Sequence, residues 1–157
     1  MEWLRDYWMA FRVWLSPTWF SQYVENYPTT CLKHKHICKL LKDSQFDYCV
    51  LQAPSTALAC YSHHVDARLS AKQFDYCVKD QSWYALAYPD VCKHLNDFQF
   101  NYCLWRHPQL ALEYKHVCDR VSDIQFDESF KMYPLLTIRT FILKRANPYQ
   151  KSFLRTC

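Results

Sequence analysis

The sequence predicts an all-α protein, an α-solenoid of about five helix-turn-helix repeats. Two observations support this prediction. The motif QFDYCV at residues 45–50 returns unchanged at 73–78, as QFNYCL at 99–104 and as QFDESF at 125–130, so that one unit recurs every 26 or 28 residues. The chain of 157 residues also contains no glycine. Because glycine is the usual residue of hairpin turns, its absence favours helices joined by short connections.

An amphipathic helix is expected over residues 1–14, where Trp3, Tyr7, Phe11 and Trp14 share one helical face. An end repeat without a cap would expose its core, so we interpret this helix as the N-terminal cap. The alternative is a helix that lies in a membrane interface.

Five repeats follow, at residues 15–40, 41–68, 69–94, 95–120 and 121–146. Three of them open with an N-cap residue, Ser70, Asn96 or Ser122, and a glutamine three positions later that completes a capping box. The repeat at 41–68 has Lys42 at this position, which cannot cap. We therefore expect Asp43 to act as the N-cap, with a shift of one residue.

Each repeat is expected to contain two helices. In the first helix of 41–68, Phe46, Cys49, Val50 and Ala53 form an apolar stripe that should face the core. Breaks are expected at Tyr27-Pro28, Ala53-Pro54, Gln81-Ser82, His107-Pro108 and Tyr133-Pro134.

A second helix should follow each break, most clearly over 108–120. The repeat at 41–68 is two residues longer between Leu58 and Val65, and we expect this insertion to loop out. Residues 147–157 should form the C-terminal cap of a single domain, 1–157, because Asn147-Pro148 is typical of a helix start.

The pattern L-[S/N]-D-x-Q-F-[D/N]-Y-C-[V/L], followed by proline and A-L-x-Y, resembles the short tandem helical repeats of bacterial and phage proteins. In outline it is similar to variant leucine-rich repeats over residues 15–146. The resemblance implies a curved α-solenoid used for binding, and it supplies no catalytic residue.

The composition argues against an enzyme. Without glycine, nucleotide-binding loops and the nucleophile elbow cannot be built in their usual form. No Ser/His/Asp or Cys/His arrangement rises above chance, so we expect no catalytic residue and no cofactor. The cysteines recur in the apolar stripes and are expected to be free core thiols.

A zinc site is not expected either. His36 with Cys38, and His116 with Cys118, point about 200° apart on a helix, so neither pair can chelate one ion. We interpret the histidines as surface or groove residues. A zinc site assembled from different helices is left open.

The charged opening of the chain does not resemble a signal peptide, and no stretch approaches the length of a membrane span. We therefore expect a cytoplasmic protein with reduced thiols.

Two rows of side chains lie off the core stripe and are our predicted contacts for a protein partner: Asp47, Asp75 and Asn101, and beside them Tyr48, Tyr76 and Tyr102. Tyrosine adds contact area at low entropic cost. The alternative is that the tyrosines fill gaps between repeats and the acids are solvated near helix N-termini.

A basic C-terminal region gives a rival hypothesis, contact with a nucleic acid or an acidic partner. Residues 43–128 hold seven basic and twelve acidic residues, whereas 129–157 hold no acid. The basic residues of this region are Lys131, Arg139, Lys144, Arg145, Lys151 and Arg155.

The sequence therefore predicts a non-enzymatic binding protein that acts as an adaptor or a stoichiometric inhibitor of an intracellular protein or complex. One hypothesis is a phage-encoded inhibitor of a host defence complex such as CRISPR-Cas, an anti-CRISPR. The sequence does not specify the oligomeric state.

Overall fold

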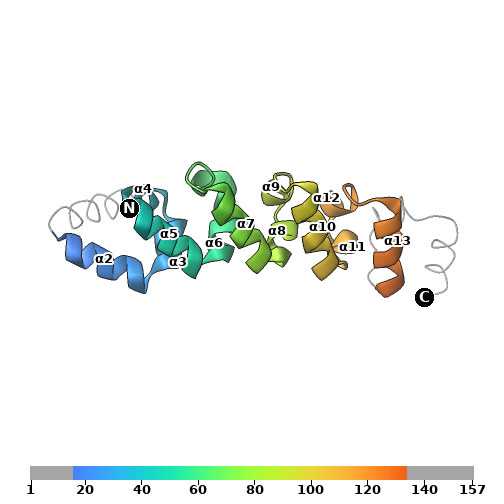
Figure 1. Ribbon diagram of the computed structural model, residues 1–157, viewed down its shortest axis with the longest axis horizontal. Helices are drawn as coiled ribbons and strands as arrows, with labels where there is room; N and C mark the ends of the chain where they lie inside the picture. Colours follow the sequence, from blue (N-terminus) through green and yellow to red (C-terminus); the bar gives the residue numbers. More distant parts are fainter. Residues whose placement is uncertain (1–15, 134–157) are drawn as a thin grey trace, which may run out of the picture. The chain divides into compact units, whose positions relative to one another are not determined.

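The computed structural model describes residues 16–133, and every regular element in that range is a helix (Figure 1). The prediction of an all-α protein is thereby confirmed for the described residues. The predicted caps at 1–14 and 147–157 lie outside them. The chain divides into two compact units, unit 1 up to Tyr84 and unit 2 from Ala85, and each is described by itself.

Five helices of ten residues carry the repeated motif. Three of them begin at the predicted N-cap residues, Ser70, Asn96 and Ser122, whose side chains accept a hydrogen bond from the backbone N–H of the glutamine three positions later. The same glutamines return the bond, so the predicted capping boxes are confirmed. The five helices are α2 (Pro17–Asn26), α5 (Asp43–Gln52), α7 (Ala71–Asp80), α10 (Asp97–Arg106) and α13 (Asp123–Met132).

The start of α5 corrects one prediction. Its N-cap is Lys42, not Asp43, and the helix keeps the register of the other repeats. Gln45 Oε1 accepts a hydrogen bond from the Lys42 backbone N–H at 3.0 Å, but an ammonium group cannot accept the reciprocal bond. Asp43 instead lies 3.3 Å from the Arg68 guanidinium. It stands in the first turn of α5, where the helix dipole stabilises a negative charge.

The expected breaks after these helices are confirmed. The residues Tyr27, Ala53, Gln81, His107 and Tyr133 each end a ten-residue helix, with ψ between 49° and 60°. Three of them precede the proline that starts the next helical segment or turn, as steric conflict with the proline ring requires: Tyr27, Ala53 and His107.

The expected single second helix is wrong for three repeats, which contain two short helices instead. The break lies at His34, Tyr88 and Tyr114, where the backbone is extended with ψ between 110° and 121°. At Tyr88 the following proline accounts for it. The short helices are α3 (Pro28–Lys33) with α4 (Lys35–Leu40), α8 (Ser82–Ala87) with α9 (Pro89–Cys92), and α11 (Leu110–Glu113) with α12 (Lys115–Cys118).

The longer repeat also differs from its prediction. After α6 (Pro54–Ala59) its two additional residues do not loop out but enter a π-helix, η1 (Tyr61–Val65). The bonds from Val65 N–H to Cys60 O and from Asp66 N–H to Tyr61 O span five residues. A π-turn takes more residues than an α-turn, so Val65 still reaches the core, where it is fully buried.

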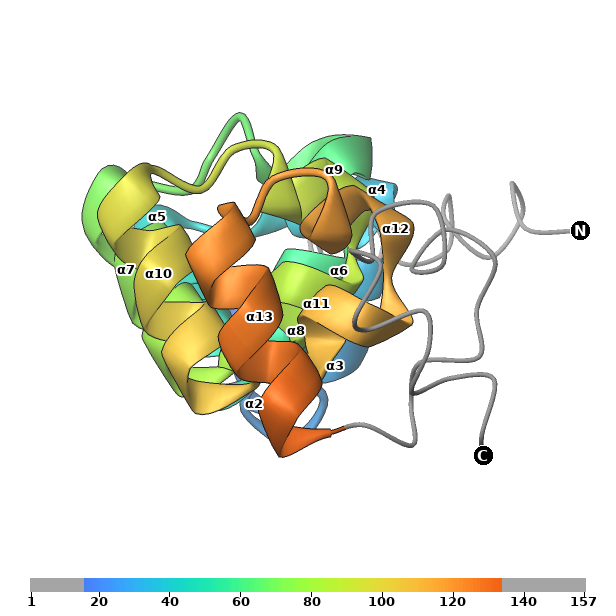
Figure 2. The same ribbon diagram turned by 90° about the vertical axis from the view of Figure 1, so that its right-hand side faces the viewer.

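In unit 2 the ten-residue helices α10 and α13 lie on one side and the short helices α9, α11 and α12 on the other (Figure 2). In unit 1, α5 packs against α3, α6 and α7, and the predicted core stripe of Phe46, Cys49, Val50 and Ala53 is buried. In unit 2, α11 packs against α12 and α13 and buries Leu110, Ala111 and Leu112 completely. All eight described cysteines have free thiols, as expected, and seven of them are buried.

One arginine in each unit holds the end of a short helix. Arg120 donates from Nη1 to the Cys92 carbonyl and from Nη2 to the Leu95 carbonyl, both at 2.6 Å. Its guanidinium carbon also lies 4.3 Å from the centroid of the Phe100 ring. Arg68 repeats this arrangement on Cys38, Leu41 and Phe46. These contacts satisfy carbonyls that a helix C-terminus leaves free.

Candidate functional site

Grooves lie between neighbouring ten-residue helices, and three of them are formed by described residues. The α2–α5 and α5–α7 grooves belong to unit 1 and have volumes of about 350 Å³ and 680 Å³. The α10–α13 groove belongs to unit 2 and has a volume of about 190 Å³. Each groove is lined by the glutamine of the repeated motif and by the residue that follows the motif phenylalanine on the preceding helix.

A hydrogen bond crosses each groove between these two residues. Gln45 Nε2 donates to Ser21 Oγ at 3.4 Å in the first groove. Gln73 Nε2 donates to Asp47 Oδ1 at 2.6 Å, and Gln125 Nε2 donates to Asn101 Oδ1 at 2.9 Å. Asp47 and Asn101, predicted as partner contacts, therefore join successive helices, although both side chains remain exposed.

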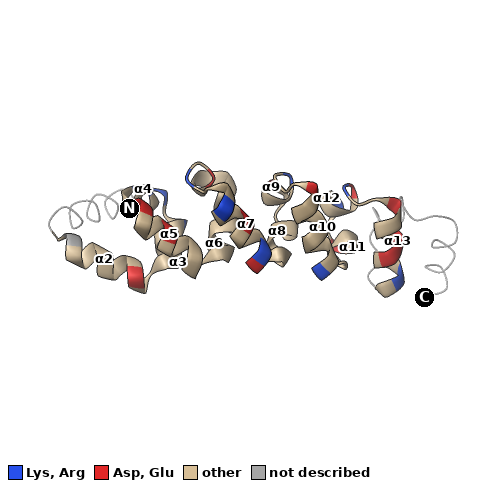
Figure 3. Cartoon of the chain, viewed as in Figure 1, with Lys and Arg blue, Asp and Glu red and all other residues tan. Residues whose placement is uncertain are grey.

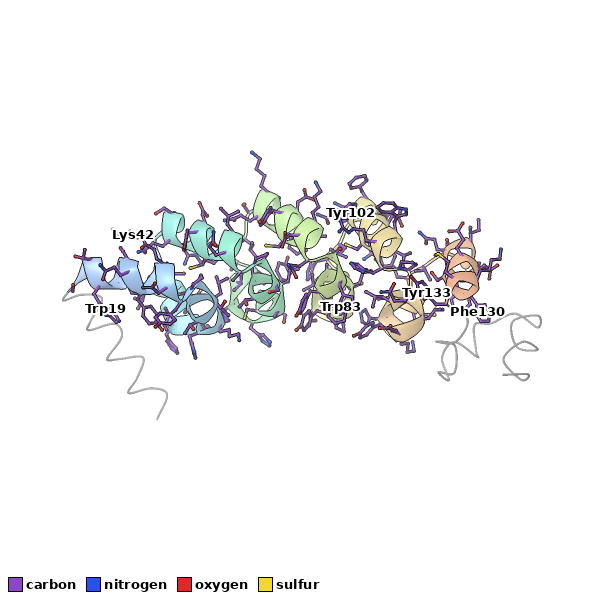
Figure 4. All side chains as sticks on the ribbon, turned by 90° about the horizontal axis from the view of Figure 1, so that it is seen from below. Trp19, Lys42, Trp83, Tyr102, Phe130 and Tyr133 are labelled. Atoms are coloured by element: carbon purple, nitrogen blue, oxygen red, sulfur yellow. The ribbon has the colours of Figure 1, made fainter. Side chains whose placement is uncertain are left out.

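The predicted tyrosine row is accessible in part. Tyr48 and Tyr76 are exposed on α5 and α7 of unit 1, and the Tyr48 hydroxyl donates to the Glu25 carbonyl at 3.5 Å. Asp75, also on α7, forms an ion pair with Lys79 at 2.7 Å. Tyr102 lies on α10 in unit 2 (Figure 4), and its hydroxyl accepts a hydrogen bond from Arg106 Nη1 at 3.0 Å.

Among residues 16–133, the apolar side chains with the highest exposed fractions belong to α10 and α13. Phe98 is 72% exposed, Trp105 79%, Ile124 73% and Met132 57%. These four side chains belong to neither the core stripe nor the tyrosine row predicted from the sequence. A signal was present, since Phe98 and Ile124 share one motif position, two residues before the phenylalanine, and lie off that stripe.

The α10–α13 groove is apolar with one carboxylate. Its lining consists of Asn101, Leu104, Trp105, Pro108, Gln125, Glu128, Ser129 and Met132. Within residues 16–133, Glu128 has no ion-pair or hydrogen-bond partner. Asp123 and Asp127 lie on the same helix, so α13 is acidic over most of its length (Figure 3).

Only one basic residue of the predicted C-terminal region lies within residues 16–133. Lys131 is exposed near the C-terminal end of α13. Its companions Arg139, Lys144, Arg145, Lys151 and Arg155 lie outside the described residues.

The buried thiols within residues 16–133 are poor candidates for chemistry. Burial raises the pKa of Cys77 and of Cys103 to about 12, so both are protonated at neutral pH. Cys31 and Cys49 are hydrogen-bonded to each other, which raises the pKa of Cys31 and lowers that of Cys49. Both side chains have no exposed surface, so a substrate cannot reach them.

Two of the histidines that we interpret as surface or groove residues are half-buried and form a polar contact with a backbone carbonyl. His64 Nε2 lies 2.7 Å from the Leu32 carbonyl and His116 Nε2 2.7 Å from the Leu86 carbonyl. Each imidazole thus holds the carbonyl end of the preceding repeat. Within the described range, no three His, Cys, Asp or Glu side chains converge to hold a metal ion.

Comparisons with known proteins add no assignment. The chain matches no protein-family model, and no curated protein or solved structure shows significant similarity to it. The likeness to variant leucine-rich repeats therefore stays a prediction. Among the described helices, none has the length and apolar character needed to cross a membrane.

Proposed function

We propose that this chain is a non-enzymatic binding protein, a helical-repeat α-solenoid of about five units whose ten-residue helices present a surface to a protein partner. The observation that carries the proposal is the exposed group Phe98, Trp105, Ile124 and Met132 on α10 and α13. Exposed apolar side chains gathered on two neighbouring helices are typical of protein-binding surfaces.

The grooves support binding more than catalysis. None of the three grooves is lined by a histidine or a cysteine, so neither an imidazole base nor a thiolate nucleophile would lie within hydrogen-bond reach of a substrate bound in them. The α5–α7 groove has the volume of a small-molecule site, and its lining combines charged side chains of both signs, Asp43, Asp47, Arg68 and Lys72, with the apolar side chains Phe46, Leu51 and Ala67.

The test is affinity capture from the native host, with mass spectrometry of the retained proteins. We expect a partner that binds the unaltered chain and is lost when Trp105 and Met132 are both replaced by alanine. Leu51 occupies on α5 the motif position that Trp105 occupies on α10, and it is also exposed. Leu51→Ala is therefore the matched control and should retain the partner.

Retention of the same proteins by the Trp105→Ala/Met132→Ala variant would contradict the proposal. Stoichiometric inhibition of a captured complex, including a host defence complex, would specify the adaptor-or-inhibitor hypothesis further. Salt-dependent binding to DNA or RNA that is lost when Lys144, Arg145, Lys151 and Arg155 are replaced would instead establish the nucleic-acid alternative.

A further inference from the structure

The α10–α13 groove is too small for an ordinary ligand but suits one side chain. Its volume of about 190 Å³ lies below the roughly 300–1,000 Å³ of small-molecule sites. Trp105 and Met132 provide an aromatic ring and a thioether beside it, and both are largely exposed. A partner that covers them removes apolar area from water.

We propose that this groove binds an arginine or lysine side chain from a basic segment of a polypeptide partner, with the cation between the Trp105 indole and the Glu128 carboxylate. The inference rests on the proposed function and names the chemistry of its partner.

Charge complementarity selects this occupant. The lining contains one carboxylate, Glu128, and no lysine, arginine or histidine. Asp123 and Asp127 add negative charge along α13 (Figure 3). The indole face attracts a cation, and the carboxylate accepts its N–H donors.

The apolar lining fits the remainder of the same side chain. Leu104, Pro108 and Met132 provide surface for the aliphatic stem of an arginine or lysine, which such residues commonly bury while the charged end stays at the rim. A glutamate on the partner would place two carboxylates together. A purely apolar residue would leave Glu128 to be desolvated without a partner.

The other grooves lack this combination and supply controls. The α2–α5 groove contains the carboxylate of Glu25 but no tryptophan. The α5–α7 groove contains Leu51 at the motif position of Trp105, but it is also lined by Arg68 and Lys72, which repel a cation. Glu25→Gln and Leu51→Ala therefore match Glu128→Gln and Trp105→Ala.

The probe is a short fluorescein-labelled peptide in which arginine alternates with leucine, titrated against the full-length protein and followed by fluorescence polarisation. Trp105→Ala and Glu128→Gln should each weaken binding by about threefold to tenfold. Glu25→Gln and Leu51→Ala should leave it unchanged. A peptide with glutamate in place of arginine should bind weakly to the unaltered chain and better to Glu128→Arg.

Equal affinity for the arginine and glutamate peptides would overturn the proposal, as would unchanged binding by Trp105→Ala and Glu128→Gln. Circular dichroism of each variant establishes that it is folded. Binding that appears only after Arg139, Lys144 and Arg145 are replaced by alanine would assign the groove to the chain's own basic segment, and it would overturn the assignment to a partner.

Binding of the captured partner to the two sets of variants distinguishes a failure of the cation inference from a failure of the proposed function. If it binds Glu128→Gln as tightly as the unaltered chain but is lost with Trp105→Ala/Met132→Ala, the cation inference fails and the proposed function stands. If no partner depends on these helices, the proposed function itself fails.

Discussion

Arg120 illustrates how single residues join the repeats. Its guanidinium donates to the Cys92 carbonyl at the end of α9 and to the Leu95 carbonyl in the segment that follows, and it covers the Phe100 ring. Lysine keeps the charge but cannot donate in this planar fork. We expect Arg120→Lys to lower the free energy of unfolding by about 1–3 kcal/mol, measured by urea denaturation. Arg106→Lys, at an exposed position on α10, is the control; an equal loss in both variants would contradict this role.

The buried thiols predict a pH dependence at the same scale. Burial raises the pKa of Cys77 and Cys103 from 9.0 to about 12. The unfolded chain therefore releases these protons first, so their contribution to stability is complete below pH 9 and falls as the pH rises toward 12. The expected loss is about 1.4 kcal/mol per pH unit for each thiol.

Chemical denaturation at pH values on both sides of 9 measures this loss. The free energy of unfolding of Cys77→Ala should decline less steeply with pH than that of the unaltered chain, because one thiol with a raised pKa is absent. Parallel declines would mean that folding does not raise the pKa of the Cys77 thiol. Other groups that titrate in this range act in both proteins and cancel in the comparison.

At the scale of elements, the motif glutamine has two functions. Its Oε1 closes the capping box, and its Nε2 donates across the groove, to Asp47 from Gln73 and to Asn101 from Gln125. Glutamate keeps the acceptor and removes the donor. In Gln73→Glu the new carboxylate then lies opposite the Asp47 carboxylate. In Gln125→Glu it lies opposite the Asn101 amide, which can turn and donate an N–H to it.

We therefore expect Gln73→Glu to destabilise the protein by about 1 kcal/mol more than Gln125→Glu. Thermal and urea denaturation of the two variants provide the comparison. Adding Asp47→Asn to Gln73→Glu should recover most of the difference, since it recreates the glutamate–asparagine pair of the Gln125→Glu variant. Equal costs without recovery would show that the two opposed carboxylates of Gln73→Glu carry no penalty.

The elements also show what the sequence could predict. Helix starts at Ser70, Asn96 and Ser122 were predictable because a capping box lies within four residues. The break at Tyr114 was not, because an apolar pattern at helical spacing continues through it. Nor was the bond from His116 to Leu86, whose partner lies 30 residues away. The exposed side chains of the candidate groove were visible in the sequence, but their exposure depends on packing.

At the scale of the whole molecule, the proposed solenoid predicts that damage stays local, because each repeat of such an array contacts only its neighbours. Leu58 in unit 1 and Leu112 in unit 2 follow an alanine at the same repeat position, and both are fully buried. Leu→Ala at such sites typically costs about 2–5 kcal/mol.

We expect Leu112→Ala to speed hydrogen exchange in α11–α13 far more than in α3 and α5, and Leu58→Ala to show the reverse. Hydrogen exchange of both variants, measured by mass spectrometry, tests this prediction. A uniform increase in the exchange rate along the chain would contradict it, because the repeats would then unfold together as one cooperative core.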